Sequence, residues 1–434
     1  MSPGRPSFSN LPRFLRRSRR PVGSESAPSG RSNAVARRLT LGGALLVLLL
    51  GGCASVPPTP AVPYTGDPWI DGNANLAVAP AKDRVLWQYR LAATGLRRER
   101  WAETRAILDD ALAQASANYG NVNSEAARSR RLFRRESDKP FIGEPYERIM
   151  AHFYRGILYW RDGEPDNARA LFRTAQLLDS DTEDKTYSGD WVILDYLDGY
   201  ASARLGGDGT DALRRARAAA KQQGRSPLPD YNRQANVFIF VEFGVGPRKY
   251  AGGEFGDRLK FYTDTSKAVS AELAVAGRIL RLAPYDDLNY QATTRGGRVM
   301  DHILGNKAVF KQTSDTIGDV ALVGAIGTAQ YGRGEDANTA ALGLAAVGLI
   351  SKLASAATSP EADTRAWDNL PQYVSVGALQ LEPGSYPATL SFYDKAGTVL
   401  PNRTQQFTLT VPEPTTTIGE APPDVVLFKS EALQ

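Results

Sequence analysis

Hydrophobic residues recur at intervals of three and four between about residues 82 and 225. This spacing predicts a series of amphipathic helices. In the clearest stretch, 148–181, Gly156 lies on one predicted helix, Phe172 lies on the next, and Gly163 marks the turn between them. A small residue lets two helices approach closely, and an aromatic ring fills the space beside it. The stretch therefore predicts a helical hairpin.

The same spacing of residues, twelve and then seven positions apart, recurs in three places. The three sets are Gly156, Ala168 and Ala175; Ala92, Thr104 and Ala111; and, with one extra turn residue, Gly199, Ala212 and Ala219. Such helix–turn–helix units resemble tetratricopeptide repeats, and three units are the minimum expected for a stacked solenoid. The closing proline and the early tryptophan of that repeat are missing. A generic array of helical hairpins is the alternative interpretation.

After about residue 225 the pattern changes to runs of aromatic and β-branched residues. Residues 235–250 predict a buried strand with Gly-Pro turn signals, and residues 255–263 are its candidate hairpin partner. Residues 265–320, which include AVSAELAVAGRILRLA, are predicted to be mostly helical. Two apolar runs rich in Gly and Ala then fill residues 317–357. They predict a tightly packed helical pair, with a membrane-inserting or oligomerising hairpin as the alternative.

The tail from residue 366 alternates apolar and polar positions, which predicts antiparallel strands, and DVVLFKS adds a candidate edge strand. We therefore predict an α+β fold. It has an N-terminal helical region of tetratricopeptide-like repeats, then a mixed segment, then a C-terminal antiparallel module that resembles a β-sandwich. The expected divisions are a signal peptide at 1–52, a lipidated N-terminus and Pro-rich tether at 53–81, helical repeats at 82–225, a mixed segment at 226–365, a small β module at 366–412, and a linker and tail at 413–434.

The N-terminus has the pattern of an export signal. An apolar run of about a dozen residues, too short to span a bilayer, follows Arg37 and Arg38. The run closes on Leu50-Gly51-Gly52-Cys53, which resembles the lipobox of bacterial lipoproteins. The resemblance implies cleavage before Cys53 and acylation of this residue, the only cysteine of the chain. A buried, inert cysteine is the alternative. Ala54, in place of aspartate, favours the outer membrane under the enterobacterial sorting rule.

Cleavage would change the charge of the protein. The full chain has a net charge of +5, and residues 1–52 contain nine arginines and one glutamate, so residues 53–434 have a net charge of −3. The basic isoelectric point of about 9.1 thus comes from the signal segment. It gives no support to a nucleic-acid partner. We expect a lipid-anchored protein at the outer membrane that faces the periplasm.

The chain carries little recognisable chemistry. It has two histidines, His152 and His302, and it lacks the phosphate-binding loop, the nucleophile elbow and the zinc-protease motif. We predict a protein that is not an enzyme and has no metal or cofactor apart from the covalent lipid. A cell-wall hydrolase or transferase is a third possibility, because two carboxylates from distant segments leave no sequence motif.

Two groups of residues are candidates for binding. The aromatic candidates for a partner-binding groove are Tyr154, Tyr159, Trp160 and Tyr196. The core between helices is the alternative location for these rings. The basic candidates for contact with anionic lipid or peptidoglycan are Arg128, Arg130, Arg131, Arg134 and Arg135. A solvated helix face is the alternative for this cluster.

The order of these features resembles a family of bacterial outer-membrane lipoproteins with tetratricopeptide-like repeats. The motifs that carry the resemblance are Glu144-Pro145-Tyr146-Glu147-Arg148, Phe243-Gly244-Val245-Gly246-Pro247 and Ala362-Asp363-Thr364-Arg365-Ala366-Trp367. The resemblance implies a role in the cell envelope and no catalytic residue. We predict a scaffold or adaptor that binds protein partners in envelope assembly or in the regulation of cell-wall synthesis, through the groove of the repeats. A membrane-associated component of a secretion or envelope assembly, which uses residues 317–357, is the alternative.

Overall fold

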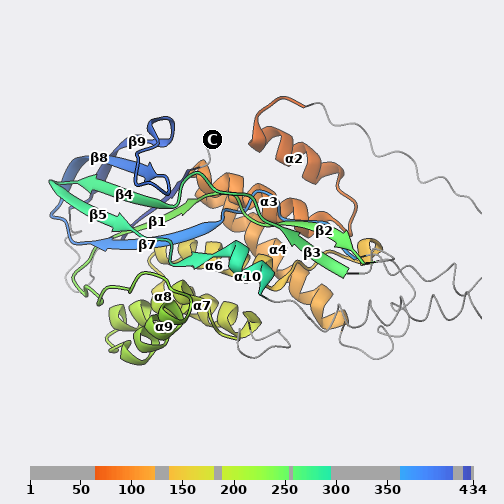
Figure 1. Ribbon diagram of the computed structural model, residues 1–434, viewed down its shortest axis with the longest axis horizontal. Helices are drawn as coiled ribbons and strands as arrows, with labels where there is room; N and C mark the ends of the chain where they lie inside the picture. The colour runs from red at the N-terminus through yellow and green to blue at the C-terminus, as the bar shows by residue number, and fades with distance from the viewer. Residues whose placement is uncertain are drawn as a thin grey trace, which may run out of the picture. The chain divides into compact units, whose positions relative to one another are not determined.

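The computed structural model describes residues 64–122, 136–179, 188–253, 258–294, 362–413 and 424–431. All of them belong to one compact unit, Pro60–Gln434, which contains both hydrophobic clusters of the protein. The predicted α+β class is confirmed, because a helical region precedes the sheets (Figure 1). The helices of this region are α2 (Pro68–Val78), α3 (Arg84–Arg97), α4 (Trp101–Val122), the 3-10 helix η1 (Glu136–Asp138), α6 (Pro145–Arg161), α7 (Pro165–Asp179), α8 (Val192–Arg204) and α9 (Thr210–Gln222).

Consecutive helices pack as three hairpins: α3 with α4, α6 with α7, and α8 with α9. Small residues permit the contacts, since a Cβ atom on Gly156 would overlap the ring of Phe172. In the first hairpin the helices approach most closely where Gly95 meets Thr104. The sequence pattern predicts this contact at Ala92, three residues before Gly95. The helical hairpins are thus confirmed. Their relationship to tetratricopeptide repeats stays a prediction.

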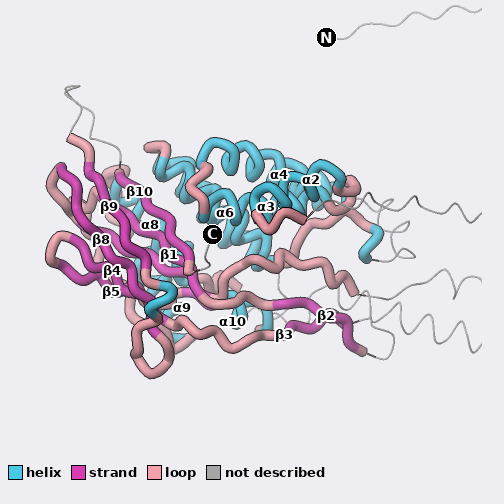
Figure 2. The backbone as a smooth tube through the Cα atoms, turned by 90° about the horizontal axis from the view of Figure 1, so that it is seen from above, coloured by secondary structure: helices cyan, strands magenta, loops and turns pink. Residues whose placement is uncertain are grey.

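The strands form two four-stranded sheets and a separate ribbon (Figure 2). The first sheet has the order β10 (Val425–Ser430), β1 (Val237–Phe243), β7 (Tyr373–Leu379) and β6 (Asp286–Asp287), in which β1 is antiparallel to β7 and parallel to β10. The second sheet is antiparallel, with the order β5 (Arg278–Leu282), β4 (Ser270–Val275), β8 (Gly384–Tyr393) and β9 (Gln405–Val411). The remaining elements are the ribbon strands β2 (Arg248–Gly252) and β3 (Arg258–Tyr262), helix α10 (Leu288–Thr293) and the 3-10 helix η3 (Pro401–Arg403).

Strand β1 explains how the layers pack, because both of its faces are buried. Ile239 and its neighbours on one face pack against the second sheet, around Leu273 and Leu390. On the other face, Phe238 lies against Trp160 and Phe240 lies against Phe153 of α6, with ring centroids 4.8 and 6.1 Å apart. A strand buried on both faces reads as a continuous apolar run, as this one does. The first sheet therefore lies between the helices and the second sheet.

The structure corrects the predicted partner of this strand. Residues 258–262 pair with 248–252, at the end of the predicted 235–250 stretch, and not with β1. The stretch breaks because Gly244 has a φ of +79° and Pro247 follows shortly after. Such residues end one strand and allow the chain to begin another in a new direction.

The prediction of helix for residues 268–283 is wrong. These residues form the β4–β5 hairpin, whose two-residue turn has positive φ at Ala276 (49°) and Gly277 (70°). This is the conformation of the type I′ turn that joins tight hairpins. Alanine and leucine favour helix in isolation, but Leu273 and alternate residues of β4 are buried in the core between the sheets. Pairing with β8 thus overrides the helical propensity.

The tail strands are confirmed, including DVVLFKS as the edge strand β10. However, pairing crosses two of the expected divisions. Strand β1 of the mixed segment pairs with β7 of the predicted β module and with β10 of the predicted tail. Strand β4 likewise pairs with β8. The strands on either side of residues 365 and 412 therefore complete the same sheets.

Candidate functional site

The predicted aromatic anchors lie mostly inside the protein. Tyr154, Trp160 and Tyr196 are at most 4% exposed. Trp160 packs on Phe238 of β1 and donates its indole N–H to Asp424 at 2.9 Å. The structure therefore corrects the predicted placement of these three rings in a groove, because strands β1 and β10 cover Tyr154 and Trp160, and Tyr196 packs against Tyr200 and Tyr231. They take the alternative location that we considered, the core.

Other predicted residues have different outcomes. Tyr159 is partly buried, and the guanidinium of Arg155 lies 3.5 Å from its ring centroid. His152 is half-buried, with Nδ1 2.9 Å from the carbonyl oxygen of Arg148. Predictions that lie outside the described residues concern Cys53, Arg128, Arg130, Arg131, Arg134, Arg135, His302 and the apolar region 317–357.

Neither a membrane span nor a metal cluster is found in the part of the chain that the structure describes. None of its helices combines the length and the apolar character needed to cross a bilayer. Its His, Cys, Asp and Glu side chains do not gather in groups of three or more suited to a metal ion.

Two of the three sequence motifs that carry the family resemblance, Glu144–Arg148 and Ala362–Trp367, meet beside α3 and α6, together with Lys249, which follows the third motif by two residues. We call this meeting point the junction and define it by Asp83, Glu147, Lys249, Arg365 and Trp367. Glu147 lies in the first turn of α6, Lys249 lies on β2, and the other two motif residues precede β7. The Glu147 carboxylate contacts Lys249 Nζ at 2.5 Å and accepts the Trp367 backbone N–H at 2.7 Å. The amino group of Lys249 also donates to the Arg365 carbonyl oxygen at 3.0 Å.

Local sequence explains why Glu147 is placed there. Pro145 follows the N-cap residue Glu144 at the start of α6, where the missing proline N–H costs nothing. The Glu147 side chain accepts the Glu144 backbone N–H at 2.6 Å and so completes a capping box. One carboxylate therefore caps a helix, pairs with a lysine and holds the segment before β7.

Burial dominates the electrostatics of the Glu147–Lys249 pair. The Glu147 side chain is 0% exposed and that of Lys249 is 1% exposed. Burial lowers the pKa of Lys249 and raises the pKa of Glu147, and in each case the opposite charge of the partner counteracts the shift. Removing one partner of such a pair would leave the other charge buried without compensation.

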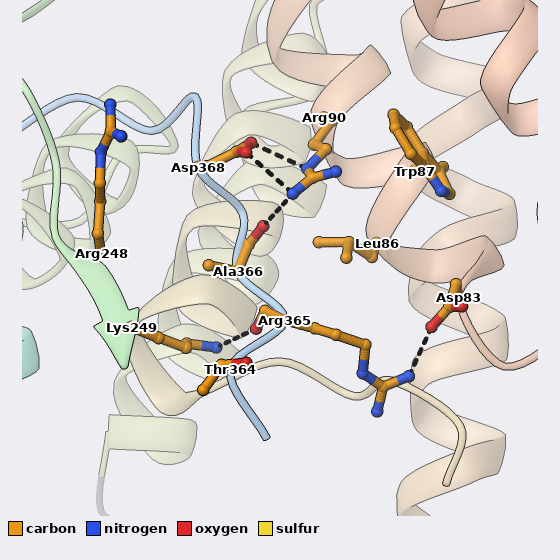
Figure 3. A pocket seen from close by; sticks show the side chains of 10 residues that line it. All are labelled: Asp83, Leu86, Trp87, Arg90, Arg248, Lys249, Thr364, Arg365, Ala366 and Asp368. Carbon is orange, nitrogen blue, oxygen red and sulfur yellow. Dashed lines mark hydrogen bonds and ion pairs between the residues drawn. The ribbon is translucent and has the colours of Figure 1, made fainter. Parts of the chain in front are cut away.

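A cavity of about 410 Å³ opens beside the junction, between α3, β2 and residues 364–368 (Figure 3). Leu86 and Trp87 supply its apolar surface. Arg90 lies 4.8 Å from the Trp87 ring and pairs with Asp368 at 2.9 Å. On another side Arg365 pairs with Asp83 at 2.7 Å. The cavity thus has apolar side chains between two arginine–aspartate pairs.

The Lys249 amino group points to Glu147 and to a backbone carbonyl, so it is not presented to the cavity as a base or nucleophile (Figure 3). The residues that line the cavity include no histidine, serine or cysteine. The hydroxyl and carboxylate groups of the lining are those of Thr364, Asp83 and Asp368.

A second cavity of about 550 Å³ lies along α7, α8 and α9. Arg169 there pairs with Asp198 at 2.7 Å, and Arg215 pairs with Asp195 at 2.9 Å. Its lining consists of charged and small residues without an aromatic or large aliphatic side chain. It therefore offers a partner no apolar anchor, and we regard the first cavity as the candidate site.

The motifs identified in the sequence include Glu147 and Arg365, and one of them ends two residues before Lys249, but no role could be assigned to any of the three from the sequence. A local signal existed only for Glu147, since Glu144, Pro145 and Glu147 match the start of a capped helix. Comparison of the chain with protein-family models, with curated proteins and with solved structures finds no match. The family resemblance of the three motifs therefore stays a prediction.

Proposed function

We propose that the chain is a non-enzymatic, lipid-anchored adaptor at the outer membrane, where it faces the periplasm and binds a protein partner of envelope assembly or cell-wall synthesis. The observation that carries this proposal is the cavity beside Trp87, with its apolar surface between two arginine–aspartate pairs. The binding surface is thus moved from the predicted repeat groove to the side of α3.

The composition of the cavity supports a protein partner. Tryptophan and arginine are enriched among the few interface residues that carry most of the binding energy, and surrounding polar contacts exclude water from them. Trp87 and Arg90 are such residues, and their neighbours Asp368 and Thr364 are exposed. The Lys249 and Asp83 contacts hold Arg365 in place, which makes the wall of the cavity rigid before a partner binds.

Replacing Cys53 by alanine is expected to move the protein from the membrane fraction to the soluble fraction, since the replacement removes the acyl acceptor of the lipobox. The measurement is cell fractionation followed by a high-salt wash, which screens electrostatic attachment. The unaltered chain, treated in the same way, should stay with the membranes. Retention of the variant after the wash would contradict lipid anchoring through Cys53. It would favour the alternative in which the apolar region 317–357 inserts.

A photo-crosslinking residue in place of Trp87 is expected to form one discrete adduct with an envelope protein in cells, because position 87 lines the cavity. The adducts are measured by immunoblotting and mass spectrometry. Arg90→Ala in the same chain should abolish the adduct, since Arg90 lies over this position and forms part of the rim.

The matched control places the same photo-crosslinking residue at Leu205, which is 50% exposed at the end of α8. Trp87 is half-buried and Leu205 is exposed, but only position 87 lies in the cavity. Identical adducts from positions 87 and 205, or an adduct that survives Arg90→Ala, would show that the cavity is not the partner site.

A further inference from the structure

The β2–β3 ribbon has an outer face that combines positive charge with tyrosine. Its side chains alternate, so that Lys249 on β2 is turned toward Glu147 of α6 while Arg248 and Tyr250 are exposed. On β3, Lys260 lies opposite Tyr250, and Tyr262 lies opposite Arg248. Cation and aromatic ring thus face each other twice across the ribbon.

The outer face also carries one acidic neighbour, since the Tyr262 hydroxyl donates to Asp264 at 3.0 Å. Within the described ranges Arg248, Arg258 and Lys260 are exposed and form no ion pair, whereas most other arginines of the helical region pair with aspartate or glutamate. Tyr250 and Tyr262 are 47% and 57% exposed. Three exposed cations and two exposed rings thus share one face of the ribbon.

The chain leaves and re-enters the described body beside this ribbon. Thr294 follows α10, which packs against β3. Ala362 begins the segment whose Arg365 carbonyl accepts a hydrogen bond from Lys249 on β2. Between the two points the sequence contains the uncharged, largely apolar stretches 320–332 and 337–351. Apolar sequence flanked by exposed tyrosines and basic residues is the arrangement found at the interface of a membrane.

We propose that the outer face of the β2–β3 ribbon docks on an anionic phospholipid surface. The three cations meet lipid phosphates, and the two tyrosines lie at the headgroup level, where one end of the ring is apolar and the other is wet. This inference rests on the proposed function in one respect, namely that the protein is tethered where such a surface is within reach. Docking would hold the body against the membrane in a fixed orientation, with the cavity beside Trp87 next to the docked face, since Arg248 also lines that cavity.

The test measures binding of the chain from Pro60 onward, which contains the whole described body but neither the lipid nor the arginine-rich leader. The probes are vesicles of phosphatidylcholine, with and without phosphatidylglycerol. The variant Arg248→Gln/Arg258→Gln/Lys260→Gln is expected to bind the anionic vesicles about 100-fold more weakly than the unaltered chain. Each removed charge should lower the affinity about fivefold, and three charges are removed. Tyr250→Ser/Tyr262→Ser is expected to weaken the binding that persists at high salt, because salt screens only the charges.

A matched variant removes three exposed cations far from the ribbon: Arg173→Gln, Lys221→Gln and Lys395→Gln. It changes the net charge by the same amount and should bind within about twofold of the unaltered chain, since screened charges away from the contact add little. Circular dichroism verifies that all variants fold. Equal losses in the two triple variants, or equal binding to neutral and anionic vesicles, would overturn the proposal.

Two further outcomes would also overturn it. Loss of binding in Arg128→Gln/Arg130→Gln/Arg131→Gln, with no loss in the ribbon variant, would assign the lipid contact to the arginine cluster. Competition by soluble glycerophosphate at the concentration of the vesicle phosphate would indicate a site for free phosphate instead of a surface. Arg90→Ala separates this inference from the proposed function, because it should abolish the adduct formed from position 87 and leave vesicle binding unchanged.

Discussion

Replacing Glu147 by glutamine is expected to lower the free energy of unfolding by about 3–5 kcal/mol, the cost of breaking a buried ion pair by removing one partner. The carboxylate contacts Lys249 Nζ at 2.5 Å and accepts the backbone N–H groups of Glu144 and Trp367 at 2.6 and 2.7 Å. A glutamine amide nitrogen cannot accept a hydrogen bond. The donors that contact one of the two carboxylate oxygens of Glu147 therefore lose their acceptor in the variant. Lys249 is left buried without its anion. Urea unfolding at neutral pH measures the loss.

The control for this loss is Asp211→Asn, which removes one carboxylate from the exposed pair of Asp211 and Arg214. That change should cost less than about 1 kcal/mol, because exposed pairs contribute little. Lys249→Met should cost less than Glu147→Gln, since the carboxylate keeps its two backbone donors. In the double variant the two losses should not add, because the partners are in direct contact. Additive losses, or equal losses from Glu147→Gln and Asp211→Asn, would show that the pair does not hold the junction together.

The Lys249→Met variant should also depend on pH in a defined direction. Without the lysine, only backbone hydrogen bonds such as that from Trp367 oppose burial, and the pKa of Glu147 lies further above its usual value. The folded chain then keeps a proton that the unfolded chain releases. Its stability relative to the unaltered chain should therefore fall as the pH rises above the usual carboxyl range.

The local pattern of apolar residues was sufficient to predict the helices and strands whose residues are buried continuously or at regular intervals. The helical hairpins followed from the spacing of Gly156 and its counterparts, and β1 followed from its apolar run. Residues 268–283 show where such reasoning fails. Their alanines and leucines favour helix, but the turn at Ala276-Gly277 and the partner strand β8 impose a hairpin. Because β8 lies more than a hundred residues further along the chain, no local signal announces it.

The junction was unpredictable for a related reason. Glu147 and Lys249 are 102 positions apart in the sequence, and Arg365 lies 116 positions beyond Lys249. Charged residues are normally expected on the surface, so composition alone would have assigned Lys249 to solvent. Only the tertiary packing of β2 against α6 makes it a buried partner. Tyr154 and Trp160 are buried in turn by β1 and β10, and their sequence pattern alone could not distinguish this covered core from the lining of an open groove.

Asp286 should make the stability of the protein depend on pH near neutrality. Its carboxylate lies at the start of α8 and accepts the backbone N–H groups of Val192 at 3.0 Å and Ile193 at 2.7 Å. The side chain is fully buried, and this burial raises its pKa to about 7 although both hydrogen bonds oppose the shift; Asp190 raises it further. Between the usual aspartate range and pH 7 the folded state therefore holds a proton that the unfolded state has lost. The free energy of unfolding should fall across this window by up to about 4 kcal/mol.

The comparison that isolates this effect is Asp286→Asn, measured by urea unfolding at several pH values between 4 and 8. Asparagine does not titrate, and its amide nitrogen leaves one of the two N–H groups unpaired, which costs about 1–3 kcal/mol at acidic pH. The difference in the free energy of unfolding between the unaltered chain and the variant should decrease as the pH rises, because only the unaltered chain loses stability through the ionisation of Asp286. Asp166→Asn, an exposed change in the first turn of α7, should show no such narrowing. A constant gap for Asp286→Asn would mean that this carboxyl is already ionised in the folded state near pH 4, and that its hydrogen bonds to α8 outweigh its burial.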